Sequence, residues 1–358
     1  MPEQPAPAAP PPLLLGQDAA RDEFLRSCRG GRLHHGWLLT GSRGVGKAAF
    51  AGIAARALLH GGVPQTAADL DVPADAPSAR LIDTGAHPDL CLLTRGFNEK
   101  TGKKRNDITI DDVRAMQERF AQTAAMDGWR VCLIDSIDDM NNNSINSLLK
   151  ILEEPNEQTI FFIVCHNPGL VPPTIHSRCR TLAFRKLPPE TLRDIIGAHL
   201  ARTEAEISEE SIAAAAFLAD GSAGRAVQIL ETDGLALYQE MLGLLAGLPR
   251  LDGEALHKLS DRFIAQNATP EQFDMFCHLL TGWLHRLIGA KVAGRVFAPV
   301  YEQETELPAR MAADPIRYVG LWEHITQSAH ETRRLGLDKK QAVLDWFARA
   351  ADIAREAA

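Results

Sequence analysis

Hydrophobic residues follow two different patterns along the chain. Up to about residue 187, short and almost uninterrupted apolar runs alternate with amphipathic stretches. Such runs predict buried parallel strands joined by helices, because a strand covered on both faces needs apolar side chains at successive positions. The clearest runs are Trp37–Thr40, Arg130–Asp135 and Thr159–Cys165. We therefore expect an α/β domain over residues 13–187.

After Pro188 and Pro189 the strand pattern stops, and only the helical spacing of apolar residues continues. The clearest helical segments are Ser208–Leu218, Leu235–Leu245, Pro270–Leu287 and Lys339–Ile353. We divide this all-α part into a small lid domain, residues 188–235, and a C-terminal domain, residues 236–358.

Composition marks the segments that do not fit either pattern. Residues 1–12 are mostly Pro and Ala, which predicts a disordered tail. Residues 61–86 are rich in Ala, Asp, Pro and Gly, and residues 98–106 carry a short basic run. We interpret both as surface insertions in the α/β domain, the basic run being a solvated loop.

Charge and cysteine content exclude several classes of protein. A net charge of -8 argues against a protein that wraps nucleic acid over most of its surface. The six cysteines are scattered without a C-x-x-C pair, so neither zinc nor a disulfide framework is predicted. The sequence also shows no long apolar run and no signal-type start. We expect a cytoplasmic protein.

One motif carries a specific chemistry. Residues 41–47 fit G-x-x-x-x-G-K, directly after an apolar run and before a strong helix former. Gly41, Gly44 and Gly46 would let backbone amides turn toward phosphate groups, and Lys47 would reach the terminal phosphates. The alternative is a chance glycine-rich turn, but the strand and helix around the motif favour a nucleotide-binding P-loop.

Two departures from the usual pattern weaken the hydrolytic part of this site. Ala48 stands where a Ser or Thr hydroxyl normally ligates magnesium. Asp135 ends an apolar run, where an Asp can hold magnesium through water, but Ser136 follows it in place of a water-activating Glu. Asp138 or Asp139 could substitute for that base, or could be solvated or capping acids. Magnesium binding is therefore predicted to be weak or absent, and ATP binding stays open.

Four segments carry a recognisable combination of motifs: Leu15–Gln17, Gly31–Gly41 leading into the P-loop, Asn146–Pro155, and Ile175–Arg180 with its Ser-Arg-Cys signature. Together they resemble the AAA+ subunits of bacterial replicative clamp loaders. The resemblance spans most of residues 13–230 and is closest to the subunits that are not motors. It implies a RecA-like domain with a parallel sheet, a helical lid, and a helical collar that holds a pentameric ring together.

The resemblance also implies roles for three side chains. Arg178, in the Ser-Arg-Cys motif, corresponds to an arginine finger that enters the ATP site of a neighbouring subunit, rather than to an ordinary surface arginine. Asn167 corresponds to a polar sensor, or else caps the turn before Pro168. Arg225 corresponds to a lid arginine that contacts phosphate, or else is a solvated arginine at a helix start.

The implied function is that of a stationary subunit in the clamp loader of the DNA polymerase III holoenzyme. Its partners would be gamma/tau-type motor subunits, a delta-type subunit, indirectly the sliding clamp, and primed DNA through the complex. Many members carry a four-cysteine zinc module after the P-loop helix, but residues 61–87 contain no Cys, so no zinc is expected here. The alternatives are a hydrolysing gamma/tau-type subunit and a stand-alone AAA+ protein that remodels DNA.

Overall fold

The computed structural model describes residues 14–31, 33–63, 66–97, 105, 107–121, 124–126, 128–203, 206–266, 268–311 and 315–356. The predicted tail at residues 1–12 and most of the basic run at residues 98–106 lie outside this part. The chain forms two compact units, Met1–Ile195 with Gly221–Gly224, and Ile196–Asp220 with Arg225–Ala358. Our finer division into three domains stays a prediction.

The first unit is built on a parallel five-stranded sheet with the strand order β2-β3-β4-β1-β5. The three predicted apolar runs form its three central strands, and every residue of these strands is buried. The parallel sheet confirms the predicted α/β domain, and the glycine-rich loop follows β1 as expected. The strands are β1 (Gly36–Thr40), β2 (Leu90–Leu93), β3 (Arg130–Ile134), β4 (Thr159–Cys165) and β5 (Arg180–Ala183).

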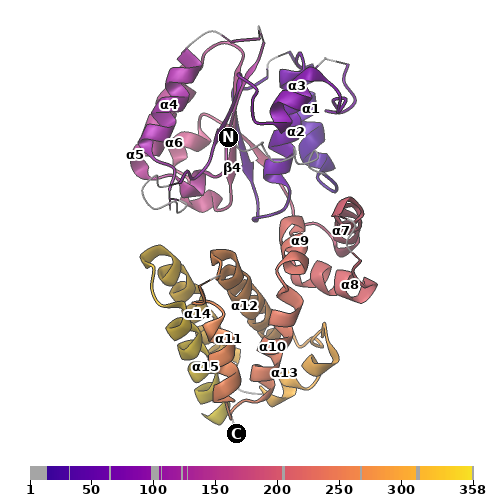
Figure 1. Cartoon of the computed structure of the whole chain (residues 1–358), viewed down its shortest axis with the longest axis vertical. Coiled ribbons are helices and arrows are strands. Elements are labelled where there is room, and N and C mark those ends of the chain that lie inside the picture. Colours follow the sequence, from indigo (N-terminus) through magenta and orange to yellow (C-terminus); the bar gives the residue numbers. More distant parts are fainter. Residues whose placement is uncertain are drawn as a thin grey trace. The chain divides into compact units, whose positions relative to one another are not determined.

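Helices cover both faces of the sheet, with α1, α2 and α3 on one side and α4 and α5 on the other (Figure 1). The pleat of β1 divides its side chains between two cores, because successive residues of a strand point to opposite faces. Trp37 and Leu39 pack with Phe24 and Phe50, whereas Leu38 belongs to the opposite core. The helices are α1 (Asp18–Arg29), α2 (Lys47–Leu59), α3 (Pro77–Asp83), α4 (Ile110–Ala121), α5 (Asn142–Glu153) and α6 (Pro173–His176).

Helix α5 has clear start and stop signals. The side chain of Asn141 accepts a hydrogen bond from the backbone N–H of Ser144 at 3.0 Å, which satisfies one of the free amides of the first turn. The helix ends at Glu153, and Pro155, which disfavours helical backbone in the residue before it, follows two positions later. These signals therefore fix the end of α5, and with it the position of Glu153.

The interpretation of residues 61–86 as a surface insertion needs correction. The described part of this segment contains α3, whose Ala79 is fully buried, and Leu70 is only 4% exposed. Asp83 at the end of α3 forms an ion pair with Arg56 of α2. Apolar burial and this partly buried ion pair hold the segment against α2, so it is part of the α/β core.

After α7 (Pro189–Thr203), the described residues of the chain form only helices and connecting segments. The four predicted helical segments are all observed, three of them longer than expected. None of the described helices combines the length and apolarity needed to cross a bilayer. The helices are α8 (Glu209–Leu218), α9 (Ala223–Glu231), α10 (Gly234–Ala246), α11 (Gly253–Asp261), α12 (Pro270–Val292), α13 (Leu307–Arg310), α14 (Pro315–Leu335) and α15 (Lys339–Glu356).

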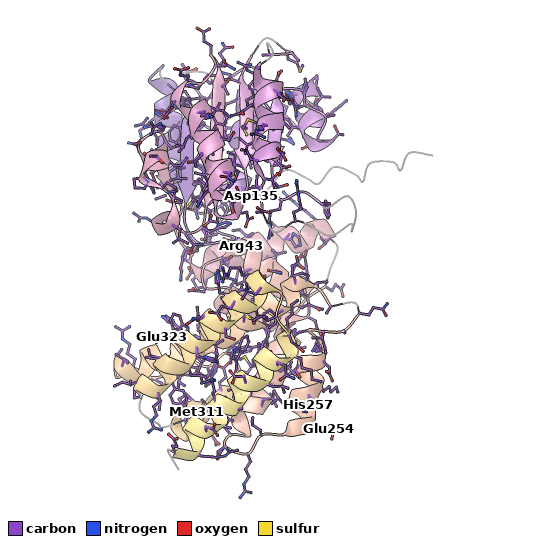
Figure 2. All side chains as sticks on the ribbon, turned by 90° about the vertical axis from the view of Figure 1, so that its left-hand side faces the viewer. Arg43, Asp135, Glu254, His257, Met311 and Glu323 are labelled. Atoms are coloured by element: carbon purple, nitrogen blue, oxygen red, sulfur yellow. The ribbon has the colours of Figure 1, made fainter. Side chains whose placement is uncertain are left out.

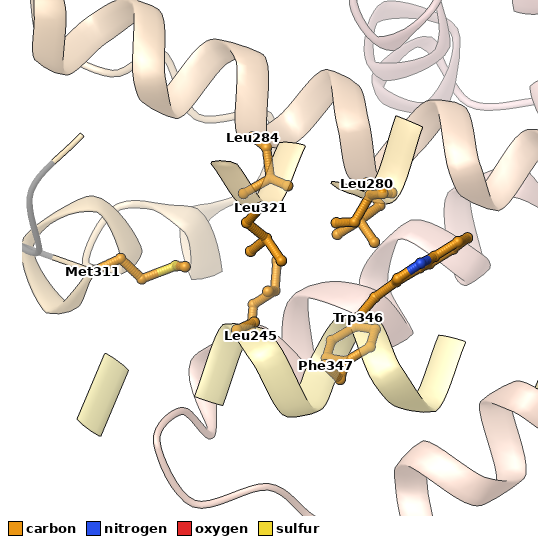
Figure 3. Close-up of a pocket in the computed structure, with 9 residues that line it drawn as sticks. Leu245, Leu280, Leu284, Met311, Leu321, Trp346 and Phe347 are labelled. Carbon is orange, nitrogen blue, oxygen red and sulfur yellow. The ribbon is translucent and has the colours of Figure 1, made fainter. Parts of the chain in front are cut away.

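The second unit has its own apolar core, built mainly by α10, α12, α14 and α15. A small cavity remains in this core and is lined only by apolar side chains (Figure 3). Cavities of this kind stay dry and offer no polar group to a ligand. Its lining includes Leu245, Leu280, Leu284, Leu321, Trp346 and Phe347.

A buried polar cluster joins α12 to its neighbours in the same unit. The guanidinium of Arg286 lies 3.3 Å from a carboxylate oxygen of Glu304, which is fully buried, and donates to the hydroxyl of Tyr238 in α10. The same guanidinium stacks over the rings of Phe217 in α8 and Phe297. One charged side chain thus ties helices α8, α10 and α12 together.

Candidate nucleotide site and the opposite edge of the sheet

The P-loop leaves the carboxyl end of β1 and wraps around the start of α2. Its three glycines have φ values of +144° at Gly41, +79° at Gly44 and +106° at Gly46, which side-chain-bearing residues rarely adopt. A Cβ atom on Gly41 would also meet the carbonyl oxygen of Phe184 at 2.5 Å. The sequence therefore needs glycine here both for the backbone turn and for the close approach of β5.

Lys47 points back into its own loop. Its ammonium donates to the carbonyl oxygens of Gly41 and of Ser42, the latter at 2.6 Å, and the residue is only 3% exposed. Burial lowers the pKa of Lys47 to about 8, although the carboxylates of Asp135 and Asp138 act in the opposite direction. The positive charge is thus held by backbone dipoles in a place that is poorly hydrated.

Asp135 and Asn167 lie near the P-loop, as the order of the strands requires. Asp135 follows β3 and Asn167 follows β4, which runs between β3 and β1, so both residues lie at the carboxyl edge of the sheet. Arg43 and Asp135 are found at the same end of the unit (Figure 2). Ala48 is exposed on the first turn of α2, where it offers only a methyl group.

The two acids that follow Ser136, Asp138 and Asp139, both have partners within the chain. The carboxylate of Asp138 accepts the backbone N–H groups of His166 and Asn167 at 2.7 and 2.9 Å, and the side-chain amide of Asn167 at 3.0 Å. Asp139 is paired with Arg95 at 3.3 Å. These partners hold both carboxylates within the chain, which favours the structural interpretation of both acids.

Three contacts at this site were not foreseen from the sequence. Burial lowers the pKa of His166 to about 4, and the nearby charges of Lys47 and Arg43 act in the same direction. Gln17 is buried and donates to the carbonyl oxygens of Val45 and of Arg185, at 3.0 and 2.8 Å. The Leu-Gly-Gln motif thus braces the P-loop, although only its resemblance to a family had pointed to it.

The third contact comes from the short segment Gly221–Gly224, which packs on the α/β unit. The backbone N–H of Gly224 donates to the carbonyl oxygen of Gly44 at 2.9 Å, and the N–H of Leu187 donates to the carbonyl of Gly221 at 2.9 Å. Arg225 follows in α9 and belongs to the helical unit. Its predicted contact with phosphate stays a prediction.

Arg178 lies at the other edge of the sheet. It precedes β5, and Arg180 pairs with Trp37 near the start of β1, whereas the P-loop begins where β1 ends. The length of β1 corresponds to roughly 13 Å between these two edges. The guanidinium of Arg178 donates to Glu153 of α5 at 2.5 Å and to the carbonyl of Thr174 at 3.0 Å. The structure therefore separates Arg178 from the P-loop of its own chain.

The same residues are contained in a match to a known family. Residues 16–188 match the family described as DNA polymerase III, delta subunit. We call residues 16–188, which are similar to this family, the delta-family domain. The match includes the P-loop, Asp135, Asn167 and Arg178, whereas Arg225 and the rest of the helical unit lie outside it. The delta-family domain thus contains both edges of the sheet described above.

Curated relatives of the delta-family domain have subunit names of one enzyme. The chain is 32% identical over 186 residues to DNA polymerase III subunit delta' of Bacillus subtilis (strain 168), a match that covers 49% of this chain and 51% of the relative. It is 36% identical over 159 residues to subunit delta' of Pseudomonas aeruginosa, covering 44% of this chain and 45% of the relative. The chain thus spans about half the length of these relatives.

A second kind of subunit matches over a longer stretch at lower identity. DNA polymerase III subunit gamma/tau of Mycobacterium bovis is 28% identical over 239 residues, which covers 65% of this chain and 39% of that protein. The delta-family domain is thus similar to both kinds of subunit. The residues of the nucleotide site therefore have to decide between a delta' and a gamma/tau subunit.

Proposed function

We propose that this chain is a delta-prime-type subunit of the DNA polymerase III clamp loader, and that it helps to load the sliding clamp onto primed DNA. One observation carries the proposal: the domain has an arginine at one edge of its sheet, while the nucleotide site at the other edge lacks two parts of the hydrolytic machinery. The delta' relatives support the same function.

Arg178 would act on the ATP of a neighbouring subunit. Its guanidinium lies at the amino edge of the sheet, is 31% exposed, and stands on a segment anchored by the buried Cys179. An arginine supplied from a neighbouring molecule stabilises the charge that develops on the transferring phosphate. In this proposal the chain supplies that charge and takes no other part in the chemical step.

The nucleotide site of the chain itself would hold phosphate without hydrolysing ATP. The loop glycines direct backbone amides to the start of α2, which is a favourable place for an anion. ATP binding is compatible with this geometry, but Ala48 provides no hydroxyl for magnesium and Ser136 cannot activate water. We expect weak nucleotide binding and negligible turnover at this site.

The proposed partners follow from the relatives. The chain would join gamma/tau-type motor subunits and a delta-type subunit in a hetero-oligomeric ring, and would reach the sliding clamp and primed DNA through that complex. The helices α12 and α15 of the second unit would contribute to the collar of the ring. The predicted lid and collar remain part of this proposal.

A hydrolysing gamma/tau-type subunit is the second candidate, favoured by the longer match to gamma/tau. Against it stand Ala48, Ser136 and the two acids that are already bonded within the chain. A stand-alone DNA-remodelling AAA+ protein would be expected to carry a basic surface, and the net charge of -8 does not favour it.

The proposal is tested by ATP turnover of the purified chain alone and mixed with the gamma/tau-type subunit and clamp of its own organism. We expect no turnover by the chain alone and stimulation in the mixture. Arg178→Ala should lower the rate of ATP hydrolysis at the neighbouring site by about 10³-fold or more. The matched control is Arg114→Ala, another exposed arginine of the same unit, which should leave the stimulation unchanged.

The opposite outcomes are equally clear. Magnesium-dependent turnover by the isolated chain would identify it as a motor subunit and would reject the proposed function. Stimulation that survives Arg178→Ala would reject the arginine finger.

A further inference from the structure

The backbone around Arg178 is fixed by several contacts. The Ser177 hydroxyl donates to the carbonyl of Thr174 at 3.0 Å, and the N–H of Arg178 donates to the carbonyl of Ile175 at 3.1 Å. Cys179 packs so closely against Gly36 that a Cβ atom there would meet its Sγ at 2.9 Å. The freedom left to this segment is therefore mostly that of the arginine side chain.

The side chain itself is held at its far end. Nη1 donates to the carbonyl of Thr174 and to the hydroxyl of Ser177, at 3.0 and 3.1 Å, and Nη2 donates to Oε1 of Glu153 at 2.5 Å. Thr174 and Ser177 belong to the arginine's own segment, whereas Glu153 comes from the last position of α5. Glu153 is thus the contact that fixes the guanidinium relative to the rest of the domain.

The position of Glu153 is unfavourable for the helix that carries it. A carboxylate in the last turn faces the negative end of the helix dipole, and a second carboxylate, Glu154, follows directly. A cation at this end offsets both effects, and Arg178 supplies one. The acidic end of α5 is therefore better explained by its contact with Arg178 than by stabilisation of α5.

We propose that Glu153 is a positioning residue for Arg178: its carboxylate orients the guanidinium toward the neighbouring subunit before the two subunits meet. This inference rests on the proposed function of Arg178. Because Glu153 and Arg178 are 51% and 31% exposed, their ion pair is weak enough to yield when phosphate arrives, yet it restricts the side chain until then. The pre-oriented arginine loses less conformational entropy when it reaches the phosphate.

The test is a double-mutant cycle on ATP turnover in the mixture with the gamma/tau-type subunit and clamp. Glu153→Gln keeps the shape of the side chain but removes its charge, and it should lower kcat by about two- to five-fold while KM for ATP is unchanged. The effect should vanish when Arg178 is already replaced by Ala. Glu154→Gln is the matched control, because it removes the neighbouring charge and has no described contact with Arg178.

The outcomes separate the two proposals. An effect of Arg178→Ala without an effect of Glu153→Gln leaves the proposed function standing and overturns the positioning role. A loss from Glu153→Gln that persists in the Arg178→Ala background, or that Glu154→Gln reproduces, means a structural or long-range effect of charge and also overturns it. No effect of Arg178→Ala would reject the arginine finger together with the role of Glu153.

Discussion

The ammonium of Lys47 carries its charge at a site that water hardly reaches. Burial lowers the pKa of Lys47 to about 8, while the carboxylates of Asp135 and Asp138 act to raise it. The carbonyl oxygens of the loop accept hydrogen bonds from the ammonium. Burial prevails because the carboxylates compensate only part of the lost hydration. At the residue scale, the P-loop therefore holds its lysine in a form that can be titrated near physiological pH.

This pKa predicts how the stability of the protein depends on pH. Between pH 8 and about 10.4, the unfolded chain keeps the Lys47 proton and the folded chain has lost it, so this group makes stability rise with pH. We expect the free energy of unfolding of the native protein to rise relative to that of Lys47→Arg across this range, by at most about 1.4 kcal/mol per pH unit. Below pH 8 the difference should be flat.

Urea unfolding at a series of pH values measures this difference. Lys47→Arg is the suitable reference because arginine keeps a positive charge that does not titrate in this range. A difference that falls as pH rises, or that does not change, would contradict the burial of Lys47.

At the scale of elements, the close packing of β1 against the Ser-Arg-Cys segment requires a glycine at position 36. A Cβ atom on Gly36 would meet Sγ of Cys179 at 2.9 Å and the carbonyl oxygen of Arg178 at 3.1 Å. Since both neighbours are fixed by the core and by α6, the segment has to shift if Gly36 is replaced. The position of Arg178 is thus set by close packing as well as by Glu153.

We expect Gly36→Ala to destabilise the protein by about 1–3 kcal/mol, the usual range for an overpacked core, and to weaken stimulation of the neighbour's ATPase. The matched control is Gly197→Ala, at an exposed position inside α7 where a Cβ atom meets nothing within 4 Å. That change should stabilise by about 0.5–1 kcal/mol. The measurement is the unfolding midpoint of each variant. If both midpoints lie above that of the native protein, or both below it, the close contact of Gly36 with Cys179 is contradicted.

Sequence patterns predicted the elements whose surroundings are uniform. The three central strands are buried at every residue, so their apolar runs are continuous. The edge strands were missed because they lack this signal: Leu92 of β2 is 61% exposed, and in β5 only Leu182 is buried. Short edge strands have one neighbour and partial cover, which leaves no clear periodicity.

The candidate site was predictable to the extent that it is local in sequence. The P-loop motif and the Asp at the end of β3 could each be located from their own segment, whereas Asn167 was located only through the resemblance to a family. The bonds of Asp138 to His166 and Asn167, of Glu153 to Arg178, and of Gly224 to Gly44 could not. Each joins distant parts of the chain, and no pattern within one segment records such a contact.

At the scale of the whole chain, one buried ion pair, Arg286 with Glu304, lies within the predicted collar. Its arginine also lies over the ring of Phe217 in α8, a helix of the predicted lid. Glu304 is fully buried and accepts the N–H groups of Val300 and Tyr301 in addition to its contact with Arg286. A buried charge of this kind is tolerated only while its partner is present. Arg286 therefore has a larger effect on stability than the exposed ion pairs of the same unit.

We expect Arg286→Met to destabilise the protein by about 3–5 kcal/mol, because it leaves the Glu304 carboxylate without its cation. Arg355→Met breaks an exposed pair with Asp352 and should change stability by no more than about 1 kcal/mol. Thermal unfolding compares the two variants. Adding Glu304→Gln to Arg286→Met should recover part of the loss, and a further loss instead would contradict the role of the pair.

The placement of Arg178 and the P-loop on opposite edges of the sheet gives the domain a polarity. Under the proposed function, contacts between such domains are head to tail rather than symmetric. An open row of them has one junction fewer than it has members, so one member can lack a working nucleotide edge without loss of a junction, provided that it stands at the end of the row. Under the proposed function, the active junctions around the ring form such a row and this chain is its terminal member: it completes the junction with one neighbour and adds no active junction on its other side.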